Sequence, residues 1–204
     1  MSRKIRFTIY GIVALFIAGT YFFNKSESFA KLPVIGKVPS FTLVDSENKN
    51  ITKEDLIDKV WVADFIFTTC QGACPVMTGN MNILHKSFKS NNDVRTVSIS
   101  VYPEYDTPEV LTNYASQYDA NIDRWHFLTG PEESIKKIIK DGFKIGDYED
   151  IIFHSEKFAL VDRNGNIRGY YNGMKTEEMS QLKKDIKKLL SEKAWTITIV
   201  FGWE

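Results

Sequence analysis

The feature that most restricts the fold of this chain is an almost continuous apolar run, VWVADFIF, at residues 60–67. Aromatic and β-branched residues dominate it, which predicts a strand buried on both faces of a sheet. A loop with the only two cysteines of the chain follows, and a helix is expected to begin at Pro75. Proline suits the first helical position because its missing N–H would be unpaired there anyway.

The rest of the chain repeats this alternation of strands and helices. Further strands are predicted at 41–44, 50–52, 93–101, 125–128, 157–161 and 167–171. Helices are predicted at 52–57, from 75 onwards, and at 106–118, 131–140 and 176–192. This order predicts an α/β domain in which a central mixed sheet is flanked by helices, with an N-terminal β-hairpin and an antiparallel pair near the end.

The C-terminal segment AWTITIVFGWE, at 194–204, alternates apolar and polar side chains over part of its length. Such alternation fits a strand that adds to an edge of the sheet. An apolar patch held near a membrane is the alternative interpretation. We expect the edge strand.

The N-terminus carries an apolar segment without charged residues, from Phe7 to Phe23. Its length is near the lower limit for a membrane-spanning helix, ~20 residues. Basic residues precede it, at positions 3, 4 and 6, so the positive-inside rule keeps the N-terminus in the cytoplasm. A cleaved signal peptide is the alternative, but the apolar run is longer than the usual ~7–15 residues. We therefore expect an uncleaved transmembrane helix.

These patterns divide the chain into a membrane anchor at 1–24, a linker at 25–38, a main domain at 39–193 and an apolar tail at 194–204. The main domain is then extracytoplasmic, in the periplasm, on the outer face of the plasma membrane or in the mitochondrial intermembrane space. The composition has 26 Lys+Arg and 26 Asp+Glu, a formal net charge of zero. That balance argues against nucleic acid as a partner, because phosphate binding needs a basic face.

The two cysteines, Cys70 and Cys74, are separated by three residues and precede a helix start. Backbone N–H groups and the helix dipole at such a position favour thiolate over thiol. A thiolate is both a soft metal ligand and a nucleophile. In an exported domain the pair can also oxidise to a disulfide. A structural disulfide, a redox-active pair and a metal site therefore all remain open.

Three histidines are candidates for a third ligand. We expect His154, in a loop just before the strand at 158–161, to face the cysteine loop. His85 continues a stripe of Met77 and Met81 at helical spacing, for which a core-facing helix surface is favoured over a copper site. His126 lies between two aromatic residues of a strand and is expected to be structural or exposed. Two thiolates and one imidazole suit copper, whereas a structural zinc site normally needs a fourth ligand.

Several further blocks accompany the cysteine loop in a fixed order. They are DFIFTTC at 64–70 with Cys74-Pro75, DTPEVL at 106–111, WHFLTG at 125–130, and His154-Ser155 ahead of LVD at 160–162 and Gly165. On these residues the chain resembles the Sco (SenC) family, membrane-anchored copper chaperones with a thioredoxin-like fold that serve cytochrome c oxidase assembly. The blocks extend from about residue 60 to 173 and are specific when taken together.

The resemblance implies that copper, as Cu(I) or Cu(II), is held by Cys70, Cys74 and His154 in a thioredoxin-like domain. It also implies that Cys70 and Cys74 form a redox-active pair. The implied partners are a copper donor protein and the oxidase subunit that contains the binuclear copper centre. The chain would deliver copper to that subunit or reduce its cysteines beforehand, as a metallochaperone with possible thiol–disulfide oxidoreductase activity.

One departure from the family pattern follows the strand at 93–101. The family usually has Asp-Pro-Glu there, and this chain has Tyr102 in place of the aspartate. The three implied ligands are unaffected, but an acid–base or partner-docking role at this position is in doubt, and Glu104 or Asp106 would replace it only in part. An extracytoplasmic thiol–disulfide oxidoreductase or redox sensor of thioredoxin type remains the alternative function. The three-residue spacer between the cysteines and the lack of proline at 154–157 argue against it.

Overall fold

The structure is a computed structural model that describes residues 31–145 and 155–200 and, before residue 31, only positions 3, 7, 10–13, 15 and 16. For residues 193–200 it describes the backbone alone. The chain divides into two compact units, Met1–Leu32 and Pro33–Glu204, and the second contains every element named below. No helix within the described positions is long and apolar enough to span a membrane. The expected anchor at 1–24 falls mostly outside them.

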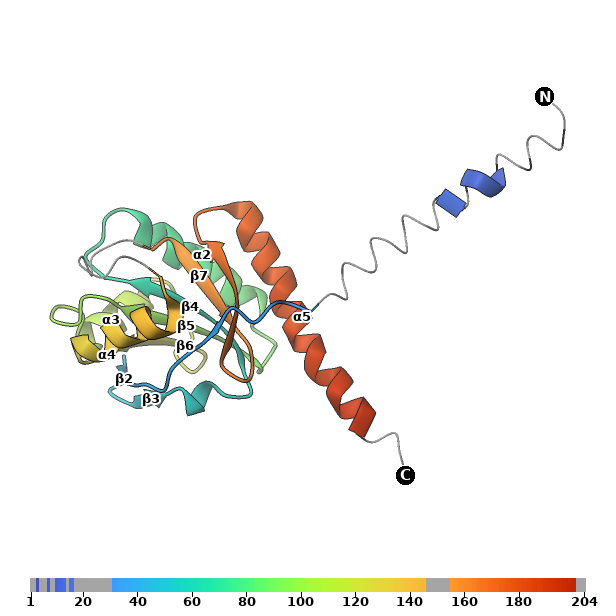
Figure 1. Ribbon diagram of the computed structural model, residues 1–204. Coiled ribbons are helices and arrows are strands. Elements are labelled where there is room, and N and C mark those ends of the chain that lie inside the picture. Colours follow the sequence, from blue (N-terminus) through green and yellow to red (C-terminus); the bar gives the residue numbers. More distant parts are fainter. Residues whose placement is uncertain are drawn as a thin grey trace. The chain divides into compact units, whose positions relative to one another are not determined.

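A single mixed sheet of eight strands forms the centre of the second unit (Figure 1), in the order β1-β8-β7-β4-β5-β6-β2-β3. Strands β4, β5 and β6 are parallel, and the strands on either side of them are antiparallel. The strands are β1 Gly36–Lys37, β2 Thr42–Asp45, β3 Asn50–Thr52, β4 Val60–Ile66, β5 Val94–Ser100, β6 Trp125–Thr129, β7 Lys157–Val161 and β8 Asn166–Asn172. The predicted mixed sheet, with β2 and β3 as its N-terminal hairpin, is confirmed.

The helices fall between these strands as the sequence predicts. They are the short 3₁₀ helix η1 Glu54–Leu56, α2 Ala73–Ser87, α3 Pro108–Ser116, α4 Glu132–Lys137, the π-helix η2 Ile138–Phe143 and α5 Thr176–Val200. Thr52 and Asp55 exchange hydrogen bonds around the start of η1, the arrangement of a capping box. Thr107 caps α3 through its hydroxyl, which accepts from the N–H of Val110.

The prediction of an edge strand in the C-terminal tail is wrong for residues 194–200. This segment continues α5 to Val200, and the edges of the sheet are β1 and β3. Once a helix has formed, each further residue adds a hydrogen bond without a new nucleation step, so the alternating pattern does not decide the structure of a segment attached to a helix. The two residues of β1 lie within the expected linker and pair with β8.

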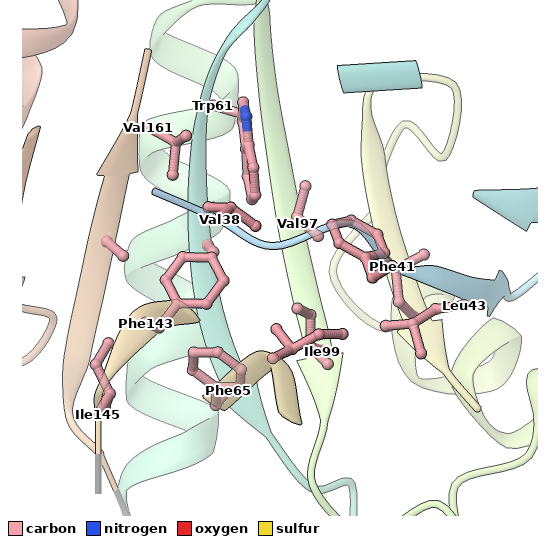
Figure 2. Packing of buried hydrophobic residues seen from close by; sticks show 14 of the residues in the cluster. Val38, Phe41, Leu43, Trp61, Phe65, Val97, Ile99, Phe143, Ile145 and Val161 are labelled. Atoms are coloured by element: carbon pink, nitrogen blue, oxygen red, sulfur yellow. The ribbon is translucent and has the colours of Figure 1, made fainter. Parts of the chain in front are cut away.

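One face of the sheet is covered by α4 and η2. Trp61, Ala63 and Phe65 of β4 point into an apolar cluster on this face, together with Phe143 of η2. The Phe143 ring meets Trp61 edge-on at 6.0 Å and Phe65 at 5.3 Å between centroids. Figure 2 shows these rings in front of β4, with Ile99 of β5 beside them. Successive side chains of a strand alternate between faces, so Asp64 must point to the opposite face.

The opposite face is covered by α2, α3 and α5. The α2 helix reaches β5 through His85, whose ring nitrogen is 3.0 Å from the Thr96 hydroxyl. It reaches α3 through a hydrogen bond of 2.8 Å between the hydroxyls of Thr78 and Tyr114. The α5 helix lies beside α2 (Figure 1). The strands β4 and β5 are parallel neighbours, and α2 and α3 follow them in the chain. The loops before these two helices therefore lie together, at the carboxyl ends of the two strands.

Candidate metal centre

The loop that carries the cysteines is held at its start by a buried carboxylate from the next strand–helix connection. Asp106 is fully buried and accepts hydrogen bonds from the N–H of Thr68 at 3.1 Å and from the Thr68 hydroxyl at 2.5 Å. The hydroxyl of Ser100, at the end of β5, donates to the same carboxylate at 2.6 Å. Several donors stabilise a buried charge. Asp106 therefore fixes the cysteine loop against the end of β5.

The two cysteines are close neighbours at the beginning of α2. The N–H of Cys70 donates to the carbonyl of Phe67 at 3.2 Å, which makes a tight turn, and Cys74 is the second residue of α2. Both residues are buried, with 8% of Cys70 and 4% of Cys74 exposed, and both thiols are free. Because the first-turn N–H groups of a helix have no partners within the helix, they are available to a thiolate at this position.

The environments of the two thiols shift their pKa values in opposite directions. Burial raises the pKa of Cys70, but N–H groups of Cys74, Gly72 and Ala73 and the thiol of Cys74 outweigh it, and the pKa lies below its usual range. Burial raises the pKa of Cys74 well above its usual range, and the negative charges of Cys70 and Asp64 add to this effect. One thiol is therefore readily ionised while its neighbour retains its proton.

Asp64 is a second buried carboxyl on the same side of the sheet. It is fully buried in the middle of β4, and neither of its oxygens has a hydrogen-bond partner among the described residues. Burial raises the pKa of Asp64 to about 7, although the neighbouring Ser98 partly offsets the increase. Sequence reasoning missed any role for this residue. A single acidic residue inside an otherwise apolar strand is the signal that points to it.

The predicted core role of the Met77, Met81 and His85 stripe is confirmed. Both methionines are buried to 1% exposure or less, and His85 is 6% exposed. The imidazole of His85 contacts the Thr96 hydroxyl and lies 5.5 Å from the Trp125 ring. Burial, with a smaller effect from positive groups such as Arg124, lowers the pKa of His85 to about 4. An imidazole packed in this way is part of the core.

His126 is half-buried on β6, and burial lowers its pKa. His154 lies outside the described residues, so its expected position opposite the cysteine loop stays a prediction. Within the described part of the chain, no group of three or more His, Cys, Asp or Glu side chains is arranged to hold a metal ion. That part contains two of the three predicted ligands, Cys70 and Cys74. Their adjacent thiols suit a soft metal ion such as Cu(I).

Tyr102, which departs from the family pattern, lies in the connection that contains Asp106. Its N–H donates to the Ser100 hydroxyl at 3.0 Å, and its ring stacks on Tyr105 with 6.0 Å between centroids and 8° between planes. Both rings are exposed, Tyr102 to 37% and Tyr105 to 50%. Asp106 does not replace a free carboxylate at this position, because its oxygens are already bound to Thr68 and Ser100.

Comparison with known proteins identifies the family. The family model described as SCO1/SenC matches residues 34–191, which is most of the chain. The chain belongs to the SCO1/SenC family. The SCO1 protein homolog of Bacillus subtilis is 39% identical over 163 residues, which covers 77% of this chain and 84% of the relative.

Solved structures of Sco proteins have the same fold as this chain. A structure of BsSco, described as a member of the Sco family of cytochrome c oxidase assembly proteins with a disulfide switch, has a TM-score of 0.69 and 37% identity, covering 78% of this chain and 96% of BsSco. ScoI of Bradyrhizobium japonicum with copper bound has a TM-score of 0.61 and 28% identity, covering 76% of this chain and 99% of ScoI. The expected thioredoxin-like fold of a Sco protein is confirmed.

Proposed function

We propose that this Sco protein is a membrane-anchored copper-binding chaperone for assembly of the binuclear copper centre of cytochrome c oxidase. Cys70, Cys74 and His154 hold the copper ion. The observation that carries the proposal is the pair of free, buried thiols with unequal proton affinities at the start of α2. The related ScoI of B. japonicum, solved with copper bound, supports it.

In this function copper is the cargo, and the chain's own residues receive and release it. Cys70 offers a thiolate first, because the backbone N–H groups around it stabilise the negative charge. Cys74 loses its proton when the ion arrives, and His154 completes a set of two sulfur ligands and one nitrogen ligand that accepts either oxidation state of copper. Asp106 accepts a hydrogen bond from Thr68 and so fixes the start of the cysteine loop against the end of β5.

The same two thiols support a companion activity, reduction of the cysteines of the oxidase subunit before copper is delivered. Two adjacent thiols, one of them readily ionised, are the requirement for thiol–disulfide exchange. The disulfide switch described for BsSco supports this activity. The alternative function, an extracytoplasmic oxidoreductase or redox sensor of thioredoxin type, uses the same chemistry without copper.

Copper titration tests the proposal. The reduced, purified full-length chain should bind one copper per chain and show the strong absorption of a Cu(II)–thiolate bond. His154→Ala should weaken copper binding and change the Cu(II)–thiolate absorption. Cys70→Ser should abolish this absorption. His126→Ala is the matched control, because it also removes a histidine and should leave the spectrum unchanged. A His154→Ala chain with unchanged affinity and spectrum would contradict the three-ligand site.

A separate measurement addresses the proposed location. If residues 1–24 form the anchor, the chain should sediment with membranes and resist extraction by high salt and alkali. When the wall or outer membrane is removed and the plasma membrane is left intact, protease added to these cells should digest the domain. Release of the chain by salt, or protection of the domain until the membrane is lysed, would contradict this location.

A further inference from the structure

Two exposed aromatic rings beside the cysteine loop have no role in the proposed copper chemistry. Tyr102 and Tyr105 lie in the connection between β5 and α3 and are 37% and 50% exposed. Their rings stack with 6.0 Å between centroids and 8° between planes. Tyr171, by contrast, is buried, and its hydroxyl donates to Asp185 inside the fold. The stacked pair therefore presents apolar ring surface to solvent rather than to the core.

Hydrogen bonds of the backbone hold this ring pair in place. The N–H of Tyr102 donates to the Ser100 hydroxyl at 3.0 Å. The carbonyl of Tyr102 accepts from the N–H of Tyr105 at 3.1 Å and from the N–H of Asp106 at 2.9 Å. Because the turn is already ordered and a tyrosine has few rotatable bonds, a partner that binds the rings loses little conformational entropy.

The same turn is joined to the cysteine loop. Asp106 follows Tyr105 and accepts from the N–H of Thr68 at 3.1 Å, and Thr68 is two residues before Cys70. Successive Cα atoms are about 3.8 Å apart, so the Cα atoms of Tyr105 and Cys70 are separated by no more than about 20 Å. About six extended residues span that distance. One segment of a client protein can therefore contact the rings while its sulfur reaches the cysteines.

The charges around the rings indicate the kind of partner that fits them. No charged side chain occurs from residue 65 to 84, which includes the cysteine loop. From residue 101 to 118 there are three acidic residues and no lysine, arginine or histidine, and two of the three, Glu104 and Glu109, are exposed. The connection after β6 adds Glu132 and Glu133, which both pair with Lys136.

Aromatic faces and carboxylates both attract a cationic side chain. A guanidinium group suits this combination best, because it stacks on an aromatic ring and also binds a carboxylate. The formal net charge of the whole chain is zero, so attraction at this surface is local and does not come from an overall field.

We propose that Tyr102 and Tyr105, together with Glu104 and Glu109, form a docking surface for a basic segment of the client protein whose disulfide the cysteine pair reduces. An arginine of that segment lies on an exposed ring face, and both carboxylates attract its charge. The inference rests on the thiol-reducing part of the proposed function and deepens it, because it names the chemistry of the segment that docks.

Thiol–disulfide exchange with two synthetic peptides tests this docking surface in the reduced, copper-free full-length chain. Each peptide has one internal disulfide, and they differ only in two residues within six positions of one cysteine, which are arginines in one peptide and glutamates in the other. In each reaction the cysteine pair becomes a disulfide and passes two electrons and two protons to the peptide sulfurs.

The quantity measured is the ratio of the rate with the arginine peptide to the rate with the glutamate peptide. The same ratio for dithiothreitol corrects for the reactivity of the peptides themselves. One cation–π contact and one exposed ion pair should give the wild-type chain a corrected preference of about tenfold for the arginine peptide. A change in the reactivity of the thiols alone cancels in this ratio.

Four variants identify the groups that produce the preference. Replacing both rings, Tyr102→Leu with Tyr105→Leu, keeps apolar side chains but removes the aromatic faces, and should lower the preference by about two- to fivefold. Replacing both by phenylalanine keeps the faces and should retain it. Glu104→Gln with Glu109→Gln should lower it, as should high salt, because exposed charges are screened. Ile83→Ala removes an exposed apolar side chain from the second half of α2 and should have no effect.

Failure of this inference and failure of the proposed function have different signatures. A wild-type chain with the same preference as dithiothreitol would overturn the docking surface and leave the thiol-reducing activity intact. A preference that persists in the double leucine variant, or that is lost in the double phenylalanine variant, would overturn the role of the ring faces. A wild-type chain that reduces neither peptide would overturn the inference together with the thiol-reducing activity. Copper titration is independent of all these results.

Discussion

Burial of Asp64 should make the stability of the metal-free chain depend on pH in a way that Asp64→Asn removes. The pKa of Asp64 is raised by burial from 3.8 to about 7 in the folded chain. A raised folded-state pKa means that the contribution of the group to stability is fully present below the unfolded value of 3.8. It is lost progressively as the pH rises through about 7.

The size of the effect follows from the two pKa values. Their difference of about three pH units, at 1.36 kcal/mol per unit, corresponds to about 4 kcal/mol in total. Part of this loss has already occurred at pH 5, because the unfolded carboxyl is ionised there. Between pH 5 and pH 8 the remaining loss is about 2–3 kcal/mol. Asp64→Asn has no charge to bury, so its stability should not show this loss. The difference in free energy of unfolding between Asp64→Asn and the wild type should therefore shift in favour of the variant by about 2–3 kcal/mol from pH 5 to pH 8.

The assay is urea denaturation of both proteins at pH 5 and pH 8, followed by tryptophan fluorescence, with a chelator and a thiol reductant present. The comparison between the two proteins matters more than either curve alone. His85 has a lowered pKa, so it contributes stability that increases with pH, and this contribution cancels in the difference. If the stability difference between wild type and Asp64→Asn is the same at both pH values, the reasoning about Asp64 is refuted.

Three further predictions concern stability and can be measured by the same denaturation assay. Asp106→Asn should destabilise the chain by about 2 kcal/mol, because an amide has a single acceptor oxygen and cannot accept from the Thr68 hydroxyl at Oδ1 and from the Ser100 hydroxyl at Oδ2 together; an unchanged free energy of unfolding would contradict the role of Asp106 in holding the loop. Phe143→Ala should destabilise it by about 3–5 kcal/mol through loss of the ring from the apolar cluster, whereas a loss below 1 kcal/mol would mean that the cluster repacks. His85→Gln should reduce the loss of stability as the pH falls from 6.5 through about 4, because the buried imidazole then no longer has to become charged; an acid transition identical to wild type would contradict this.

The strongest sequence-based predictions about the site came from residues that are neighbours in the chain. The strand at 60–67, the cysteine loop and the helix after it follow from an apolar run, two cysteines and Pro75, and the structure has β4 and α2 there. The core role of His85 followed from helical spacing alone. The role of Asp106 in holding the cysteine loop was not predicted from the sequence. Asp106 and Thr68 are 38 residues apart and meet only because two parallel strands, β4 and β5, end side by side.

Local pattern and tertiary packing therefore determined different properties of this protein. The sequence by itself determined the alternation of strands and helices and the place of Cys70 and Cys74 next to the start of a helix, since each depends on nearby residues. Only the tertiary structure decided that residues 194–200 continue α5, and that Asp64 is fully buried with no hydrogen-bond partner among the described residues. Burial and hydrogen bonding depend on which surfaces meet, and the order of strands in a sheet cannot be inferred from the periodicity of any one strand.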